Sequence, residues 1–180
     1  LGLLMLLSCG YADRHRNNSS CEQVLVDSLE VRVQDSLFSN VHYSRSQVLD
    51  ALTQAQDSQV YYRLLALYGK TFFVSSDFDS ILYYNRRVKE FFRNASQSSE
   101  SLQSPQWNDV LSDVYNIEGN VWMQLNRPDS AITDYKKAYE YRLRGKKLHL
   151  LPDICINTAD AYLHRSDLAH TASYYRRALF

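Results

Sequence analysis

The sequence has 180 residues, of which 45% are hydrophobic and 22% are charged, and this composition suits a folded chain and excludes a disordered tail. Twenty basic and twenty acidic residues give a formal net charge of zero, so the chain lacks the overall basic excess typical of proteins that bind duplex nucleic acid. Five Gly and three Pro are too few turn formers for a many-stranded sandwich or barrel, and long helices are expected instead.

The first ten residues, LGLLMLLSCG, form a short apolar run that ends in a small residue and a cysteine. Eight apolar residues fall far short of the roughly 20 that a helix needs to cross a bilayer. The order Leu6-Leu7-Ser8-Cys9 resembles the lipobox of bacterial lipoproteins. The resemblance implies that residues 1–9 form a signal and lipobox segment, which is cut before Cys9 so that its thiol takes a lipid anchor. An ordinary secretory signal is the alternative, because neither a starting Met nor a basic segment precedes the apolar run.

Residues 10–20 are polar and show no periodicity, which predicts a tether between a membrane and the fold. Asn18 or Ser20 is expected to cap the helix that follows. The stretches CEQVLVDSLEVRV and SRSQVLDALTQA then carry apolar residues at i, i+3 and i+4, the spacing of amphipathic helices. Together they predict a degenerate helical hairpin over residues 21–58.

A common pattern recurs three times between residues 59 and 180. In each copy a small residue is followed by further packing positions at offsets of 3, 12, 16 and 19, and a pair of Arg or Lys precedes the last of them. The three sets are Gly69, Phe72, Ile81, Asn85 and Val88; Gly119, Trp122, Ala131, Tyr135 and Ala138; and Ala159, Tyr162, Thr171, Tyr175 and Ala178.

This pattern resembles the tetratricopeptide repeat (TPR), in which Gly and Ala at fixed positions let paired helices approach closely and aromatic side chains fill the space beside them. The resemblance implies an all-α fold, a right-handed α-solenoid of about four helical hairpins, with repeats at about 62–95, 112–145 and 152–180. The Ser-rich stretch 94–106 is expected to link the first two repeats. The second helix of the last repeat is unfinished at Phe180, so we expect a truncated array.

The same resemblance implies a concave groove lined by the first helix of each repeat. The exposed positions of these helices in the last two repeats are Asn116, Asn120, Met123, Asn157, Asp160 and His164. Asn side chains both donate and accept hydrogen bonds, so they suit an extended peptide backbone. A protein or peptide partner is therefore expected in the groove, and the alternative is that these residues are ordinary solvated positions.

Nothing in the sequence predicts catalysis, a metal or a cofactor. The cysteines Cys9, Cys21 and Cys155 are odd in number and contain no CxxC pair, so neither a disulfide framework nor a zinc site follows. No two of the five histidines stand at i, i+4, and no Gly-rich phosphate loop, GxSxG or HExxH sequence is present. Cys155 is expected to be a small core residue.

Two cellular contexts fit these expectations. In the first, the array is the sensing part of a bacterial signal-transduction protein, with a membrane helix and an output domain following it. In the second, it is a stand-alone TPR lipoprotein that acts as an assembly scaffold. Both contexts place the chain in the cell envelope, on the extracytoplasmic, periplasmic side, and anchor it to a membrane through a lipid or a transmembrane segment.

Overall fold

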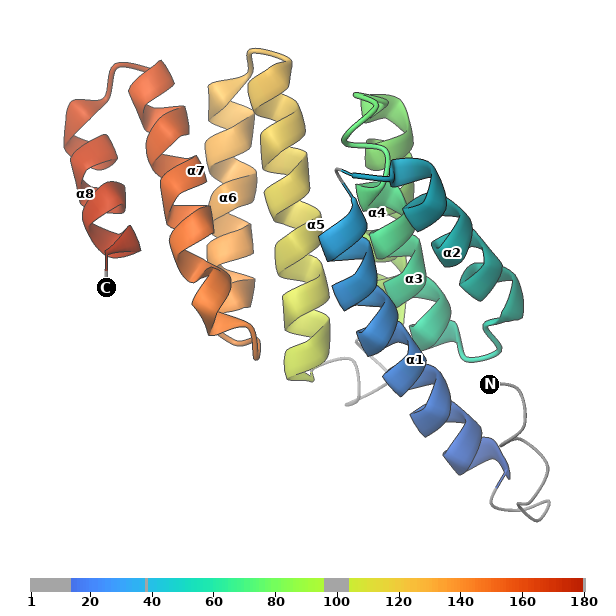
Figure 1. The fold of residues 1–180 in the computed structure, drawn as a ribbon. Coiled ribbons are helices and arrows are strands. Elements are labelled where there is room, and N and C mark those ends of the chain that lie inside the picture. The colour runs from blue at the N-terminus through green and yellow to red at the C-terminus, as the bar shows by residue number, and fades with distance from the viewer. Residues whose placement is uncertain (1–13, 38, 96–103, 180) are drawn as a thin grey trace. The chain divides into compact units, whose positions relative to one another are not determined.

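The computed structural model describes residues 14–37, 39–95 and 104–179, and the regular elements in these ranges are all helices (Figure 1). They are α1 (Arg14–Ser36), α2 (Val41–Gln54), α3 (Ser58–Lys70), α4 (Phe78–Ala95), α5 (Pro105–Gln124), α6 (Pro128–Arg142), the short 3₁₀ helix η2 (Leu148–Leu150), α7 (Leu151–His164) and α8 (Leu168–Ala178). The all-α class is therefore confirmed. The predicted signal segment with Cys9 lies outside the described residues.

The chain divides into two compact units, residues 1–75 and 76–180. In the first unit, α1, α2 and α3 pack against one another. In the second, neighbouring helices pack in pairs from α4 to α8. The boundary falls between α3 and α4, so the two helices of the repeat predicted at 62–95 belong to different units.

The first unit is built on one apolar stripe of α1. Three residues of this stripe and the residue directly after the helix are at most 2% exposed: Val26, Leu29, Val33 and then Leu37. Arg63 of α3 is also buried, and its guanidinium group donates hydrogen bonds to Asp27 and Glu30 of α1. The unit thus combines an apolar core with an ion-pair contact between two of its helices.

Helix α1 starts earlier than the sequence predicts. Residues 10–20 predict a polar tether with Asn18 or Ser20 at the helix cap, but α1 begins at Arg14. Asn18 and Ser20 therefore lie inside α1 and neither is its N-cap. The prediction is wrong because it relies on the periodicity of apolar residues, and a polar helical turn carries none.

Three turns of the chain share a backbone feature at the same sequence offset. The non-glycine residues with positive φ in the described chain are Ser76, Asn126 and Ser166, with φ of 53°, 57° and 59°. Each stands seven residues after one of the aligned small residues, and the next helix begins two residues later, at Phe78, Pro128 or Leu168. Left-handed residues commonly end a helix because they turn the chain away from its axis.

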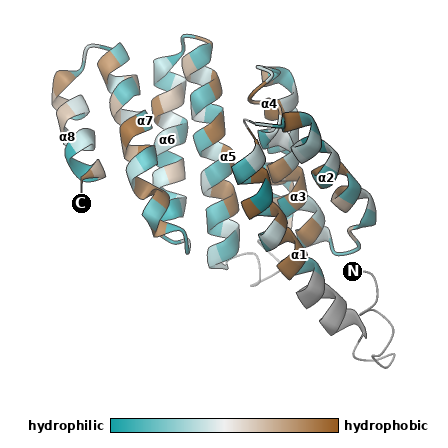
Figure 2. Cartoon of the chain, viewed as in Figure 1, coloured by the Kyte–Doolittle hydropathy of each residue, from teal (hydrophilic) through white to brown (hydrophobic). Residues whose placement is uncertain are grey.

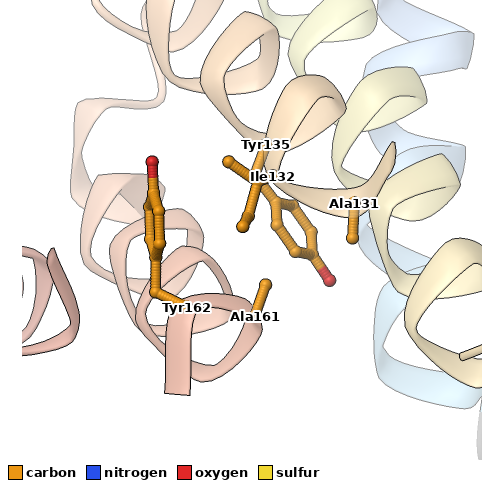
Figure 3. Packing of buried hydrophobic residues seen from close by; sticks show 5 residues of the cluster. All are labelled: Ala131, Ile132, Tyr135, Ala161 and Tyr162. Carbon is orange, nitrogen blue, oxygen red and sulfur yellow. The ribbon is translucent and has the colours of Figure 1, made fainter. Parts of the chain in front are cut away.

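In the second unit the helices bury small and aromatic residues together. Figure 3 shows the cluster of Ala131, Ile132, Tyr135, Ala161 and Tyr162, in which α6 meets α7 and each residue is at most 5% exposed. Figure 2 shows hydrophobic positions set among hydrophilic ones on α5 to α8, as expected of helices that bury one face. Helix α6 packs against both α5 and α7 and so holds these two helices in one unit.

Candidate functional site

The six predicted groove residues lie on α5 and α7, and a hydrogen bond between two of them joins these helices. Asn157 of α7 donates a hydrogen bond from Nδ2 to Oδ1 of Asn116 on α5, at 3.0 Å. Both side chains are partly buried. The Nδ2 group of Asn116 and the Oδ1 atom of Asn157 have no partner in the described chain, so the pair keeps an amide NH₂ group and an amide oxygen for another molecule.

Two tyrosines fix the next pair of predicted residues. The Tyr135 hydroxyl on α6 donates to Oδ1 of Asn120 at 2.7 Å, and the Tyr175 hydroxyl on α8 donates to Oδ1 of Asp160. Each donor stands 15 residues after its acceptor. Burial raises the pKa of Tyr135, and the hydrogen bond to Asp160 raises the pKa of Tyr175. The side-chain oxygens of Asn120 and Asp160 are therefore each held by a tyrosine of the helix that follows.

The last two predicted groove residues differ in how accessible they are. Met123 is partly buried and packs against the cluster of Figure 3, so it serves the core of the second unit. His164 is exposed in the last turn of α7. Of these two, His164 is the side chain that solvent or a ligand reaches.

Two exposed aliphatic side chains adjoin these polar residues. Ile156 is 42% exposed and Leu163 is 48% exposed, and both lie on α7. They stand four residues before and three residues after Asp160, so the three side chains share one face of the helix. We define the α5–α7 face as Asn116, Asn120, Ile156, Asn157, Asp160 and Leu163.

The charges of the second unit are unevenly divided among its helices. Helices α5 and α7 carry five acidic residues and neither Lys nor Arg: Asp109, Asp113, Glu118, Asp153 and Asp160. Helix α8 carries Arg176 and Arg177 and no acidic residue. A chain whose net charge is zero therefore has an acidic set of helices and a basic one.

Most of the predicted packing residues in the second unit are buried. A Cβ atom added to Gly119 would lie within 2.8 Å of three ring carbons of Tyr135, so the glycine is required for this contact. Trp122 donates from Nε1 to Asp134 of α6 at 2.8 Å. The residues at most 4% exposed are Ala131, Tyr135, Ala138, Ala159 and Tyr162.

Other predicted packing residues behave differently. Tyr175 is 38% exposed and Ala178 is partly exposed. Helix α8 therefore buries its predicted packing residues less completely than α6 does. In the first unit Gly69 is buried and Phe72 is partly buried, with the Arg45 guanidinium carbon 4.0 Å from the centre of the Phe72 ring. Phe72 thus packs on a cation of α2.

Sequence reasoning misses a buried ion pair between α5 and α6. Asp109 is 4% exposed and Arg142 is 1% exposed, and Nη1 of Arg142 donates to Oδ1 of Asp109 at 2.8 Å. The same carboxylate accepts the backbone N–H groups of Lys146 and Lys147 at 2.9 and 3.1 Å. Gly145 lies so close to this carboxylate that a Cβ atom would be 2.8 Å from Cγ of Asp109. Asp109 therefore holds the chain that leaves α6.

A second missed cluster joins α4, α5 and α6. Glu118 of α5 is 3% exposed, and its carboxylate pairs with Nζ of Lys89 on α4 at 2.6 Å. Burial raises the pKa of Glu118, and the Lys89 charge partly opposes that rise. The ammonium groups of Lys89 and Lys137 lie 5.1 and 5.0 Å from the centre of the Tyr115 ring. Burial raises the pKa of Tyr115 to about 12.

The remaining findings bear on other kinds of site. Among the residues that the structure describes, no group of three His, Cys, Asp or Glu side chains is placed to hold a metal ion. None of the described helices is both long enough and apolar enough to cross a membrane. Cys155 is buried, as the sequence predicts. No protein-family model matches the sequence, and no curated protein matches it.

Proposed function

We propose that this chain is a TPR-like α-solenoid module that binds a protein or peptide through the α5–α7 face, and that it acts by binding without catalysis. The observation that carries the proposal is the repetition of one contact in two consecutive hairpins. Tyr135 donates to Asn120, and Tyr175 donates to Asp160, at the same offset and from the same side of the hairpin. Repeat proteins are built from such equivalent contacts.

A second repeated contact supports the same register. Trp122 meets Asp134 through a hydrogen bond, and Tyr162 meets Tyr174 through rings stacked with centroids 5.6 Å apart. In each pair the first residue stands three positions after the aligned small residue, which is Gly119 or Ala159. The second residue stands fifteen positions after that small residue. The positive φ of Ser76, Asn126 and Ser166 adds a third feature at a constant offset.

The α5–α7 face is suited to binding because it combines polar groups with exposed apolar surface. Asn116, Asn120 and Asn157 offer amide donors and acceptors at its centre, where they can pair with a peptide backbone. Ile156 and Leu163 lie beside them and gain free energy when a partner covers them, because apolar surface removed from water contributes about 25 cal/mol per Å².

The test uses peptides selected from a random 12-residue library against the full chain. The double variant Ile156→Ser, Leu163→Ser is expected to weaken their binding about tenfold or more, since two half-exposed aliphatic side chains together contribute about 1.5–3 kcal/mol when buried. The control is Leu143→Ser, Leu148→Ser, which removes two leucines that are each 51% exposed elsewhere in the same unit. Equal binding by the two double variants would exclude the α5–α7 face as the binding surface.

The proposed setting is the cell envelope, where the module would be the sensing part of a signal-transduction protein. The sequence Leu6-Leu7-Ser8-Cys9 favours a second candidate, a lipid-anchored scaffold. If that candidate is right, the protein in its native cells incorporates radiolabelled palmitate, and Cys9→Ala abolishes the label and releases the chain from the membrane fraction. An unlabelled protein recovered with a much larger mass would favour the sensor instead.

A further inference from the structure

We propose that the partner of the α5–α7 face is a cationic peptide segment in which two Lys or Arg residues flank an apolar residue. This inference rests on the proposed function and names the chemistry of the partner. It starts from the position of the charges in the second unit.

Some carboxylates of α5 and α7 are already paired with a cation of the chain, and others are not. Asp109 is paired with Arg142, and Glu118 is paired with Lys89, and both acids are buried. Asp113 shares the Arg142 guanidinium group. In the described chain, Asp153 and Asp160 have no cationic partner and are exposed. They are therefore the carboxylates of α5 and α7 that remain for another molecule.

These two carboxylates lie on either side of exposed apolar surface. Asp153 and Asp160 stand seven residues apart on α7, which separates them by about 10 Å along the helix. Ile156 lies between them in the sequence, and Leu163 follows one turn after Asp160. A partner that places an apolar side chain against Ile156 thus has a carboxylate on either side of the contact.

The other helices of the second unit carry the opposite charge. Besides Lys89, which pairs with Glu118, helix α4 carries Arg86, Arg87 and Arg93 against two acids, and α8 carries two arginines and no acid. A cationic segment is repelled by these helices and attracted to α7, so the charge pattern directs it to the α5–α7 face. An acidic or neutral segment gains no such preference.

The experiment characterises the peptides selected from the random 12-residue library in two ways. Their sequences are expected to be enriched in Lys and Arg around an apolar residue. Their dissociation constants for the full chain are then measured by fluorescence polarisation at about 50 and 300 mM salt, where screening weakens contacts between exposed charges. The variant Asp153→Asn, Asp160→Asn is expected to weaken binding about threefold to tenfold at the lower salt concentration and less at the higher. Asp160→Asn keeps an oxygen that accepts the Tyr175 hydroxyl.

The matched control is Asp79→Asn, Glu90→Gln, which removes two exposed carboxylates from α4 and is expected to leave binding within about twofold. Acidic or neutral peptides that bind in a manner sensitive to Ile156→Ser, Leu163→Ser would overturn the charge inference and leave the proposed function standing. Cationic peptides that bind both carboxylate variants equally would also overturn it. Peptides insensitive to Ile156→Ser, Leu163→Ser would overturn the proposed function together with this inference.

Discussion

At the scale of single residues, Gly119 of α5 lets the Tyr135 ring of α6 approach closely. A glycine inside a helix costs about 1 kcal/mol relative to alanine, so its presence in α5 needs a compensating gain. The gain is the buried Tyr135 ring, which occupies the space of the missing Cβ atom and reaches Asn120 with its hydroxyl. The identity of residue 119 is thus set by a side chain of the next helix.

Gly119→Leu is expected to lower the free energy of unfolding by about 1–3 kcal/mol or more, because the added side chain overlaps the Tyr135 ring. Urea denaturation followed by circular dichroism measures the loss. In a Tyr135→Ala background the same substitution is expected to cost less, since the ring is gone. A Gly119→Leu midpoint equal to that of the wild type would contradict this packing.

The two aspartates that contact Arg142, Asp109 and Asp113, differ in their exposure to solvent. Asp113 contacts the same guanidinium group, but its side chain is 41% exposed, whereas that of Asp109 is 6% exposed. Breaking a buried pair leaves an uncompensated charge, and breaking an exposed one does not. The two aspartates therefore contribute different amounts to the free energy of unfolding, although they share a partner.

We expect Asp109→Ala to destabilise the chain by about 3–5 kcal/mol and Asp113→Ala to destabilise it by about 1 kcal/mol or less. The Asp109 substitution also removes the acceptor of two backbone N–H groups, at Lys146 and Lys147. Thermal unfolding of the two variants side by side measures the difference, and similar melting temperatures would show that the buried pair contributes little.

At the scale of elements, α4 and α5 are joined by polar contacts as well as apolar ones. Asn85 is fully buried and donates from Nδ2 to the backbone oxygen of Val114 at 3.2 Å, one turn of helix away from the Lys89–Glu118 pair. Asn85 occupies the position that Tyr135 and Tyr175 hold in the other two copies. The two tyrosines bond to the helix that precedes them, whereas Asn85 bonds to the helix that follows it, so the α4–α5 contact is held by hydrogen bonds and one ion pair.

This arrangement makes the stability of the second unit depend on pH. The folded chain holds the pKa of Glu118 above its ordinary value of 4.5, so folding favours the protonated carboxyl group. The stability contributed by this group is full below pH 4.5 and is lost as the pH rises through the raised pKa. Relative to the wild type, Glu118→Gln is expected to become progressively more stable as the pH rises from 4.5.

Urea unfolding at a series of pH values measures this difference. Lys89→Met supplies a second readout, because removing the cation that lowers the pKa of Glu118 moves the loss of stability to higher pH. A difference between Glu118→Gln and the wild type that stays constant across the series would contradict the role of the buried carboxyl group.

The elements predicted from the sequence are those with an apolar repeat or a distinctive turn residue. Helix α6 begins at Pro128 inside the repeat expected at 112–145, and the fixed φ of proline suits the first turn of a helix. Helix α5 begins at Pro105, before the repeat start expected near residue 112, and its first turns already bury Trp107, Val110 and Leu111 at helical spacing. The Asp109–Arg142 contact could not be predicted, because its partners stand 33 residues apart and resemble ordinary surface charges.

At the scale of the whole molecule, each of the two units has its own buried residues. Ile81, Val88 and Leu111 are at most 1% exposed in the second unit, and Val33 and Val48 are at most 1% exposed in the first. A unit with its own core is able to fold alone. The boundary after Ser75 is thus a natural place to divide the chain.

We expect a fragment of residues 76–180 to keep its helical circular dichroism and to unfold cooperatively in urea. A fragment that begins at residue 104 lacks α4 and leaves Glu118 without Lys89, so it is expected to unfold at a lower urea concentration. Loss of cooperative unfolding in the longer fragment would mean that the second unit depends on the first.

Both tryptophans of the chain, Trp107 and Trp122, lie on α5. Trp107 is 2% exposed and packs near Phe91 and Phe92 of α4, while Trp122 is bound to Asp134 of α6. Tryptophan emission is therefore an intrinsic probe confined to the second unit, whereas far-ultraviolet circular dichroism records the helices of both. The two signals followed in one denaturation experiment separate the melting of the second unit from that of the first without any label.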